Sequence, residues 1–136
     1  MVVIDTNVLV RLLVNDDAGQ ARRARALFER EQVFISPTVL LESEWVLRSA
    51  YGLASARIIG LLRAVLGLPG VTTDRPQALA EALDACDKGL DFADALHMLL
   101  SAHAGPGDRP RVFYSFDIRL RQRAARHLPA LPTAAP

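Results

Sequence analysis

The sequence predicts an α/β protein with three layers, α/β/α, around a central parallel sheet of four or five strands. Short apolar segments, rich in Val and Ile, alternate along the chain with longer stretches of helical periodicity. Parallel strands require crossover connections of this kind, about a dozen residues or more and usually helical. The composition, with 51% hydrophobic and 23% charged residues in 136 positions, is typical of a folded chain and excludes a disordered one.

The first half of the chain opens with a β-branched strand over residues 2–4 that ends at Asp5. We expect Thr6 or Asn7 to cap the following helix, over residues 8–13. The elements predicted next are a helix over 20–30, a strand over 33–35, a helix over 38–51 with Pro37 in its first turn and Gly52 as its stop, a helix over 54–66 and a weak strand over 71–73.

The second half continues the same alternation as far as a short tail. The predicted elements are a helix over 76–87, a helix over 91–104, a strand over 112–115 and a helix over 117–127. Residues 129–136 contain three of the eight prolines, and they are expected to form a loose tail with at most one edge strand. The expected organisation is one domain over 1–128 and a proline-rich tail over 129–136.

Charge and cysteine content narrow the functional classes. The net charge is only +1, but residues 108–126 hold six arginines against two aspartates, so a basic surface can lie beside a separate acidic site. A single cysteine, Cys86, excludes an internal disulfide and fits a reducing compartment. Because no secretory signal and no apolar run of about 18 residues is seen, we expect a cytoplasmic protein without a membrane partner.

Two acidic residues follow predicted strands, at the carboxyl ends where α/β proteins usually bind ligands. Asp5 follows the first strand, and Asp117 follows the strand over 112–115. The carboxyl ends of parallel strands share one rim of the sheet, so both carboxylates are expected at that rim. Each could also be an ordinary helix cap, because aspartate often caps a helix that follows a strand.

Two predicted helices supply further carboxylates. Glu42 and Glu44 lie about 200° apart on their helix, so only one of them can face the rim. Asp91 and Asp94 are three residues apart and share a helix face. Clustered carboxylates repel one another, and a hard divalent cation, Mg²⁺ or Mn²⁺, offsets that repulsion. The three histidines and one cysteine form no zinc pattern, and no phosphate-binding glycine loop is present.

Four segments resemble the motifs of PIN-domain ribonucleases, in the expected order. They are Val-Ile-Asp5-Thr6-Asn7-Val-Leu, Ser36-Pro-Thr-Val-Leu-Leu-Glu42-Ser-Glu-Trp45-Val-Leu-Arg, Asp91-Phe-Ala-Asp94-Ala-Leu-His97 and Phe113-Tyr-Ser115-Phe-Asp117. Chain size and the Glu-x-x-Trp-Val-Leu pattern are most similar to VapC toxins, the nuclease components of bacterial toxin–antitoxin pairs.

The resemblance implies a function and a set of residues. It implies Mg²⁺- or Mn²⁺-dependent cleavage of single-stranded RNA by a homodimer that a VapB-type antitoxin binds. Asp5, Glu42, Asp94 and Asp117 match the acidic quartet of the family. Thr6, Asn7 and Ser115 match polar positions beside it, and Asp91 is an auxiliary acid.

The hypothesis is therefore metal-assisted hydrolysis of a phosphodiester. Asp5, Asp94 and Asp117 would hold the ion, and Glu42 would complete its shell or orient the attacking water. Arg119 and Arg123, four apart on one helix, would hold the RNA backbone, or alternatively would form salt bridges at the surface or with an antitoxin.

Three other residues are expected to have structural roles, and two other functions are consistent with the sequence. His97 and Trp45 are expected to be structural, and Cys86 is expected in the core. One alternative function is a non-catalytic PIN-like module that binds RNA or protein. The other is a metal-dependent phosphatase with Asp5 as nucleophile, although the second aspartate expected two residues later is Asn7.

Overall fold

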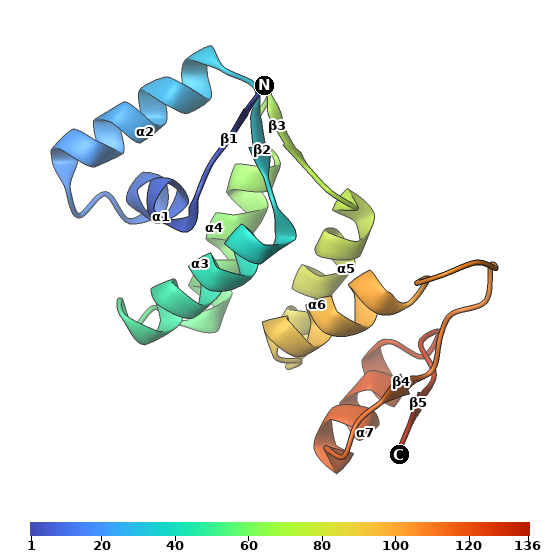
Figure 1. The fold of residues 1–136 in the computed structure, drawn as a ribbon. Coiled ribbons are helices and arrows are strands. Elements are labelled where there is room, and N and C mark those ends of the chain that lie inside the picture. Colours follow the sequence, from blue (N-terminus) through green and yellow to red (C-terminus); the bar gives the residue numbers. More distant parts are fainter. The chain divides into compact units, whose positions relative to one another are not determined.

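The computed structural model describes residues 1–136, which form two compact units, Met1–Pro76 and Gln77–Pro136 (Figure 1). The first unit contains β1 (Val2–Val3), α1 (Thr6–Val14), α2 (Ala18–Arg30), β2 (Val33–Ile35), α3 (Pro37–Ser49), α4 (Ser55–Leu66) and β3 (Val71–Thr73). The elements that follow are α5 (Pro76–Asp87), α6 (Phe92–Ser101), β4 (Phe113–Tyr114), α7 (Ile118–His127) and β5 (Thr133–Ala134).

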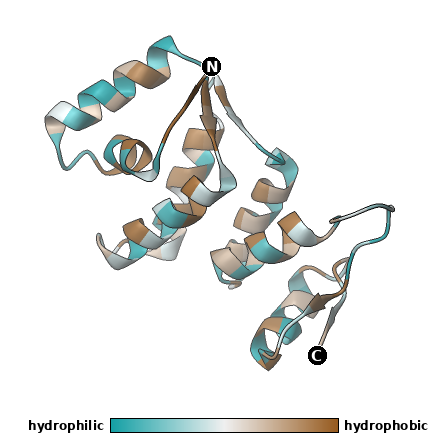
Figure 2. Ribbon diagram, in the orientation of Figure 1, coloured by the Kyte–Doolittle hydropathy of each residue, from teal (hydrophilic) through white to brown (hydrophobic).

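A three-stranded parallel sheet organises the first unit. Strand β2 lies between β1 and β3, as Figure 1 shows. The register places Val33 beside both Val2 and Val71. Val33 and Ile35 are fully buried, and β1 and β2 are brown in the hydropathy colouring of Figure 2. Each parallel pair is joined by two helices, α1 and α2 for the first pair and α3 and α4 for the second.

The helices of the first unit pack through apolar stripes at helical spacing. Helix α1 contacts both α2 and α3, and α3 contacts α4, which also contacts β3. One side of each helix is buried, as periods of three and four residues require. The buried apolar residues of these helices are Leu9, Val10, Ala21, Ala24, Leu40, Leu47, Ile58, Ile59, Leu62 and Val65.

The second unit contains a βαβ arrangement at its C-terminal end. Strand β4 pairs in parallel with β5, with Phe113 opposite Thr133, and α7 forms the crossover between them. The single edge strand expected within residues 129–136 therefore forms, as β5. The buried apolar residues of this unit are Leu79, Ala82, Leu83, Ala85, Cys86, Leu90, Phe92, Ala95, Leu96, Met98, Leu99, Ala102, Leu120, Ala124 and Leu131.

The predicted α/β class with parallel strands is confirmed, and five strands form, three hydrogen-bonded in one sheet and two in another. The predicted cap of the first helix was wrong, because Asp5 rather than Thr6 or Asn7 caps α1. Helix α6 ends at Ser101, earlier than the expected 104. Among the seven helices, none combines the length and the apolar character needed to cross a membrane.

Candidate active site

Three of the candidate aspartates cap the helices that follow them. The Oδ1 atom of Asp5 accepts a hydrogen bond from the amide of Val8 at 3.0 Å, and Asp117 Oδ1 accepts one from the amide of Leu120 at 3.0 Å. Asp91 caps α6 in the same way, at 3.1 Å. The capping interpretation of Asp5 and Asp117 is thus confirmed. It does not exclude a second role, because each capping hydrogen bond uses only Oδ1 of the carboxylate.

A short side-chain hydrogen bond connects two of the predicted motifs in the first unit. The hydroxyl of Thr6 on α1 donates to Glu42 Oε2 on α3 at 2.5 Å. Thr6 is only 9% exposed, whereas Glu42 is exposed. The other candidate on α3, Glu44, is paired instead with Arg48 at 2.9 Å. Thr6 directly follows Asp5 in the sequence. Its hydrogen bond to Glu42 therefore places Glu42 beside the first acidic motif.

In the second unit two aspartates, Asp91 and Asp117, act electrostatically on Asp94. Partial burial raises the pKa of Asp94 above its ordinary value, and the negative charges of Asp91 and Asp117 raise it further. His97, one turn along α6, lowers the pKa of Asp94 and so opposes this shift. Burial first, and two like charges second, therefore disfavour the charged form of the Asp94 carboxyl group.

The auxiliary polar residues behave differently from one another. Ser115 Oγ accepts a hydrogen bond from the amide of Asp117 at 3.0 Å and fixes the backbone at the start of α7. Thr6 contacts Glu42, as described above. Asn7 is exposed and makes no side-chain hydrogen bond. Thr6 and Ser115 therefore support acidic residues directly, and Asn7 does not.

The quartet is divided between the two units. Asp5 and Glu42 belong to the first, and Asp94 and Asp117 to the second. Within neither unit do three or more His, Cys, Asp or Glu side chains form a group able to hold a metal ion. The donor chemistry still fits Mg²⁺ or Mn²⁺, because all four side chains are carboxylates and these ions prefer oxygen ligands.

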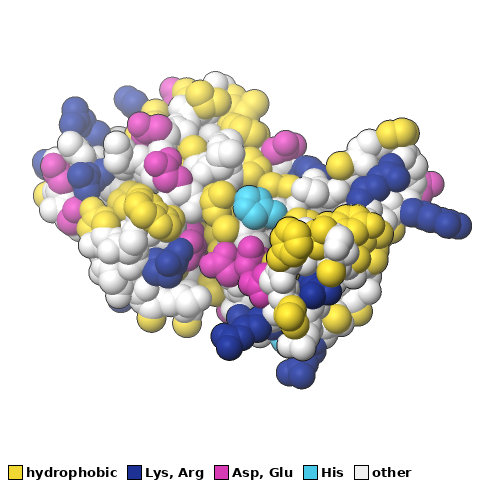
Figure 3. Space-filling model, turned by 60° about the horizontal axis from the view of Figure 1, so that its bottom comes forward, with side chains coloured by type: hydrophobic (Ala, Val, Ile, Leu, Met, Phe, Trp, Pro, Cys, Tyr) yellow, Lys and Arg dark blue, Asp and Glu magenta, His cyan; other side chains and the backbone are white.

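The predicted basic surface of the C-terminal part is found on α7. Arg119, Arg123 and Arg126 are exposed there, opposite the buried residues Leu120 and Ala124. One guanidinium nitrogen of Arg123 donates to the carbonyl of Gly89 at 3.2 Å, so this arginine also fastens the turn before α6. On the face drawn in Figure 3, Arg and Lys side chains project from the surface.

Two residues expected to be structural are exposed. Trp45 is 57% exposed, because the buried stripe of α3 contains Leu40, Ser43 and Leu47, and Trp45 lies about 200° around the helix from Ser43. His97 is exposed and lies one turn from Asp94. Cys86 is buried, as predicted. The prediction for Trp45 was wrong because its apolar sequence neighbours do not lie on the same face of α3 as Trp45 itself.

A polar network that the sequence did not reveal ties α1 to the end of α3. Arg11 bonds both carboxylate oxygens of Asp16, at 2.8 and 2.9 Å, and the hydroxyl of Tyr51 at 2.9 Å. Tyr51 in turn donates to Asp16 at 2.7 Å. The bond from Tyr51 is the main cause that lowers the pKa of Asp16. Because Tyr51 is 35 residues from Asp16, only the tertiary structure brings them together.

Comparison with known proteins gives one clear result. The family model for the PIN domain matches residues 2–125, nearly the whole chain. Neither the curated proteins nor the solved structures that were searched gave a match. The matched range includes all four candidate acids and most of both units, and it ends within α7, before the C-terminal strand β5. This chain therefore belongs to the PIN domain family.

Proposed function

We propose that this protein is a Mg²⁺- or Mn²⁺-dependent endoribonuclease that hydrolyses phosphodiester bonds in single-stranded RNA. PIN domains are typically metal-dependent nucleases. The observation that supports the proposal most is the charge around Asp94, where burial and two neighbouring aspartates raise the pKa of one carboxyl group. A structural domain gains nothing from such repulsion, whereas a cation site needs it.

The acids have distinct proposed roles. Asp5, Asp94 and Asp117 hold the cation, and Glu42 completes its shell or orients the attacking water. The capping hydrogen bonds hold one oxygen of Asp5 and one oxygen of Asp117 at the starts of α1 and α7. When bound, the cation supplies Lewis acidity toward the phosphoryl group and lowers the pKa of water.

Supporting residues restrict the motion of these acids. The hydroxyl of Thr6 holds one oxygen of Glu42 and leaves the other free. The hydroxyl oxygen of Ser115 accepts a hydrogen bond from the backbone amide of Asp117 and so holds the main chain at the start of α7. We propose that Arg119 and Arg123 on α7 contact the RNA backbone, because an arginine fork fits phosphate oxygens.

The test is cleavage of a labelled single-stranded RNA with Mg²⁺ or Mn²⁺ and its loss in EDTA. Because Asp5 and Asp117 are helix caps, they should be replaced by asparagine, which caps equally well and removes only the charge. We expect Asp5→Asn, Asp94→Asn and Glu42→Gln to lose cleavage while they stay folded. Glu44→Gln is the matched control on the same helix, and it should cleave like the parent protein.

Three outcomes would contradict the proposal. Retained cleavage in both Asp5→Asn and Asp94→Asn would separate the activity from these acids. Hydrolysis of an aryl phosphate without cleavage of RNA would favour the phosphatase alternative, and RNA binding without hydrolysis at any metal concentration would favour the binding module.

We further propose that the protein is the toxin of a type II toxin–antitoxin pair, of the VapC kind, and acts as a homodimer. The proposal rests on the Glu42-x-x-Trp45-Val-Leu pattern and on chain size. A short reading frame for a DNA-binding partner should lie directly upstream. Its co-expression should restore growth that this protein alone arrests, and Asp94→Asn alone should arrest nothing.

A further inference from the structure

A pocket between α1 and α2 lies outside the acidic groups. Its volume is about 330 Å³, within the range of pockets that hold small ligands. Helix α1 contributes its first two turns to the lining and α2 contributes one face. The lining residues are Asn7, Val8, Arg11, Gln20, Arg23, Ala24, Leu27 and Arg30. The whole pocket belongs to the first unit.

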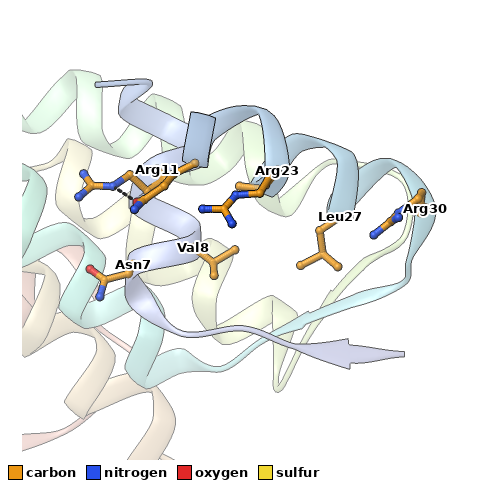
Figure 4. Close-up of a pocket in the computed structure, with 8 residues that line it drawn as sticks. Asn7, Val8, Arg11, Arg23, Leu27 and Arg30 are labelled. Atoms are coloured by element: carbon orange, nitrogen blue, oxygen red, sulfur yellow. Dashed lines mark hydrogen bonds between the residues drawn. The ribbon is translucent and has the colours of Figure 1, made fainter. Parts of the chain in front are cut away.

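The charge of this pocket has one sign. Three of its eight lining residues are arginines, and none is acidic. Arg11 is committed to Asp16 and Tyr51, and it also donates to Gln20 at 2.7 Å, the bond drawn dashed in Figure 4. Arg23 and Arg30 are exposed and form no ion pair. Two guanidinium groups are therefore free to bind an anion.

The shape of the pocket places an apolar surface between polar ends. Figure 4 shows Asn7 at one end and Arg30 at the other, with Val8 and Leu27 between them and Arg23 over Val8. The aliphatic floor offers contact area to a sugar or a base. The amide of Asn7 offers a donor and an acceptor.

The location of the pocket connects it to the proposed active site. Asn7 is two residues from Asp5, and both lie in or directly before the first turn of α1. An RNA strand bound at Asp5 would therefore reach the pocket at its Asn7 end. A volume of about 330 Å³ suits a ligand with the size of one nucleotide, and the guanidinium groups of Arg23 and Arg30 favour an anionic one.

We propose that this pocket is a subsite for one nucleotide of the single-stranded RNA, beside the scissile bond. Arg23 and Arg30 bind its flanking phosphates, and Val8, Ala24 and Leu27 contact the sugar or base. This inference rests on the proposed ribonuclease function. It adds a binding site on α1 and α2 that is separate from α7 and from the acidic quartet.

The experiment measures RNA affinity by fluorescence anisotropy of the full chain with a labelled single-stranded RNA of about 16 nucleotides, in EDTA so that the RNA stays intact. Arg23→Ala and Arg30→Ala should each weaken binding about fivefold, the effect of one exposed charged contact. Each should also lower the slope of log affinity against log salt by about 0.7. Arg23→Lys should bind with intermediate affinity, because it keeps the charge and loses the fork.

Matched controls come from the same helix. Arg22 and Arg25 are exposed on α2 but do not line the pocket, so Arg22→Ala and Arg25→Ala remove the same charge. If all four alanine variants weaken RNA binding equally, the total positive charge of α2 attracts the RNA, and the subsite is disproved. Unchanged binding in an Arg23→Ala, Arg30→Ala double variant also disproves it.

Other outcomes separate this inference from the proposed function. If the parent protein cleaves and binds RNA while the pocket variants bind normally, only the subsite fails. If those variants instead lose a co-expressed protein partner, the pocket belongs to that partner, and the subsite is likewise disproved. If the parent protein neither binds nor cleaves RNA, both proposals fail.

Discussion

The bond between Thr6 and Glu42 can be tested by one substitution that removes a single hydroxyl. Thr6→Val keeps the shape of the side chain and deletes the donor that lies 2.5 Å from Glu42 Oε2. A hydrogen bond to a charged group contributes about 1.5–3 kcal/mol when both partners are shielded from water. Because Glu42 is exposed, water replaces part of the lost bond, and we expect a loss of about 1 kcal/mol.

This magnitude gives two measurable effects. With a urea dependence of about 2 kcal/mol per molar, the unfolding midpoint should fall by about 0.5 M. If the same energy holds Glu42 in its catalytic orientation, kcat/KM for RNA cleavage should fall about fivefold. Both are measured on purified protein, by urea titration followed by circular dichroism and by initial rates with labelled RNA.

Thr6→Ser is the matched control, because it keeps the hydroxyl and loses only a methyl group. It should retain the parent cleavage rate. The reasoning is refuted if Thr6→Val unfolds at the parent midpoint and cleaves at the parent rate. It is also refuted if Thr6→Ser loses as much activity as Thr6→Val, because packing rather than the hydrogen bond would then position Glu42.

Three further predictions concern the remaining carboxylates. The pKa of Asp16 is lowered, chiefly by the hydrogen bond from Tyr51, so the Asp16 carboxylate stabilises the folded protein above its ordinary pKa and loses this effect as the pH falls through the lowered pKa. In urea titrations, the loss of stability caused by Asp16→Asn should therefore become smaller below about pH 4. A loss of stability that does not depend on pH would contradict this. The pKa of Asp94 is raised by burial and by Asp91 and Asp117, so its carboxylate lowers the stability of the folded protein once the pH rises through the raised pKa. Asp94→Asn in EDTA should therefore be more stable than the parent protein at pH 7 and equally stable in acid. Equal stability of the two proteins at both pH values would contradict this. Asp117→Ala should lower the unfolding free energy by about 1 kcal/mol through loss of the α7 cap, whereas Asp117→Asn should not, and equal losses in thermal or urea unfolding would argue against capping as the cause.

The sequence alone determined the class of fold and most of its elements. Local signals carry this information, because β-branched runs and helical periodicity depend on neighbouring residues. Pro37 does begin α3, and the strand over 33–35 has the predicted bounds. The sequence left three adjacent candidates for the first helix cap, Asp5, Thr6 and Asn7, and the backbone conformation selects Asp5.

Only the tertiary structure decided which side chains meet. The helical repeat showed that just one of Glu42 and Glu44 could face the first motif, and the contact with Thr6, 36 residues away, selected Glu42. The same holds for the exposure of Trp45 and for the pocket between α1 and α2, which depend on how helices pack. Local patterns fix the period of a helix, but its rotation about its own axis is set by the neighbours it packs against.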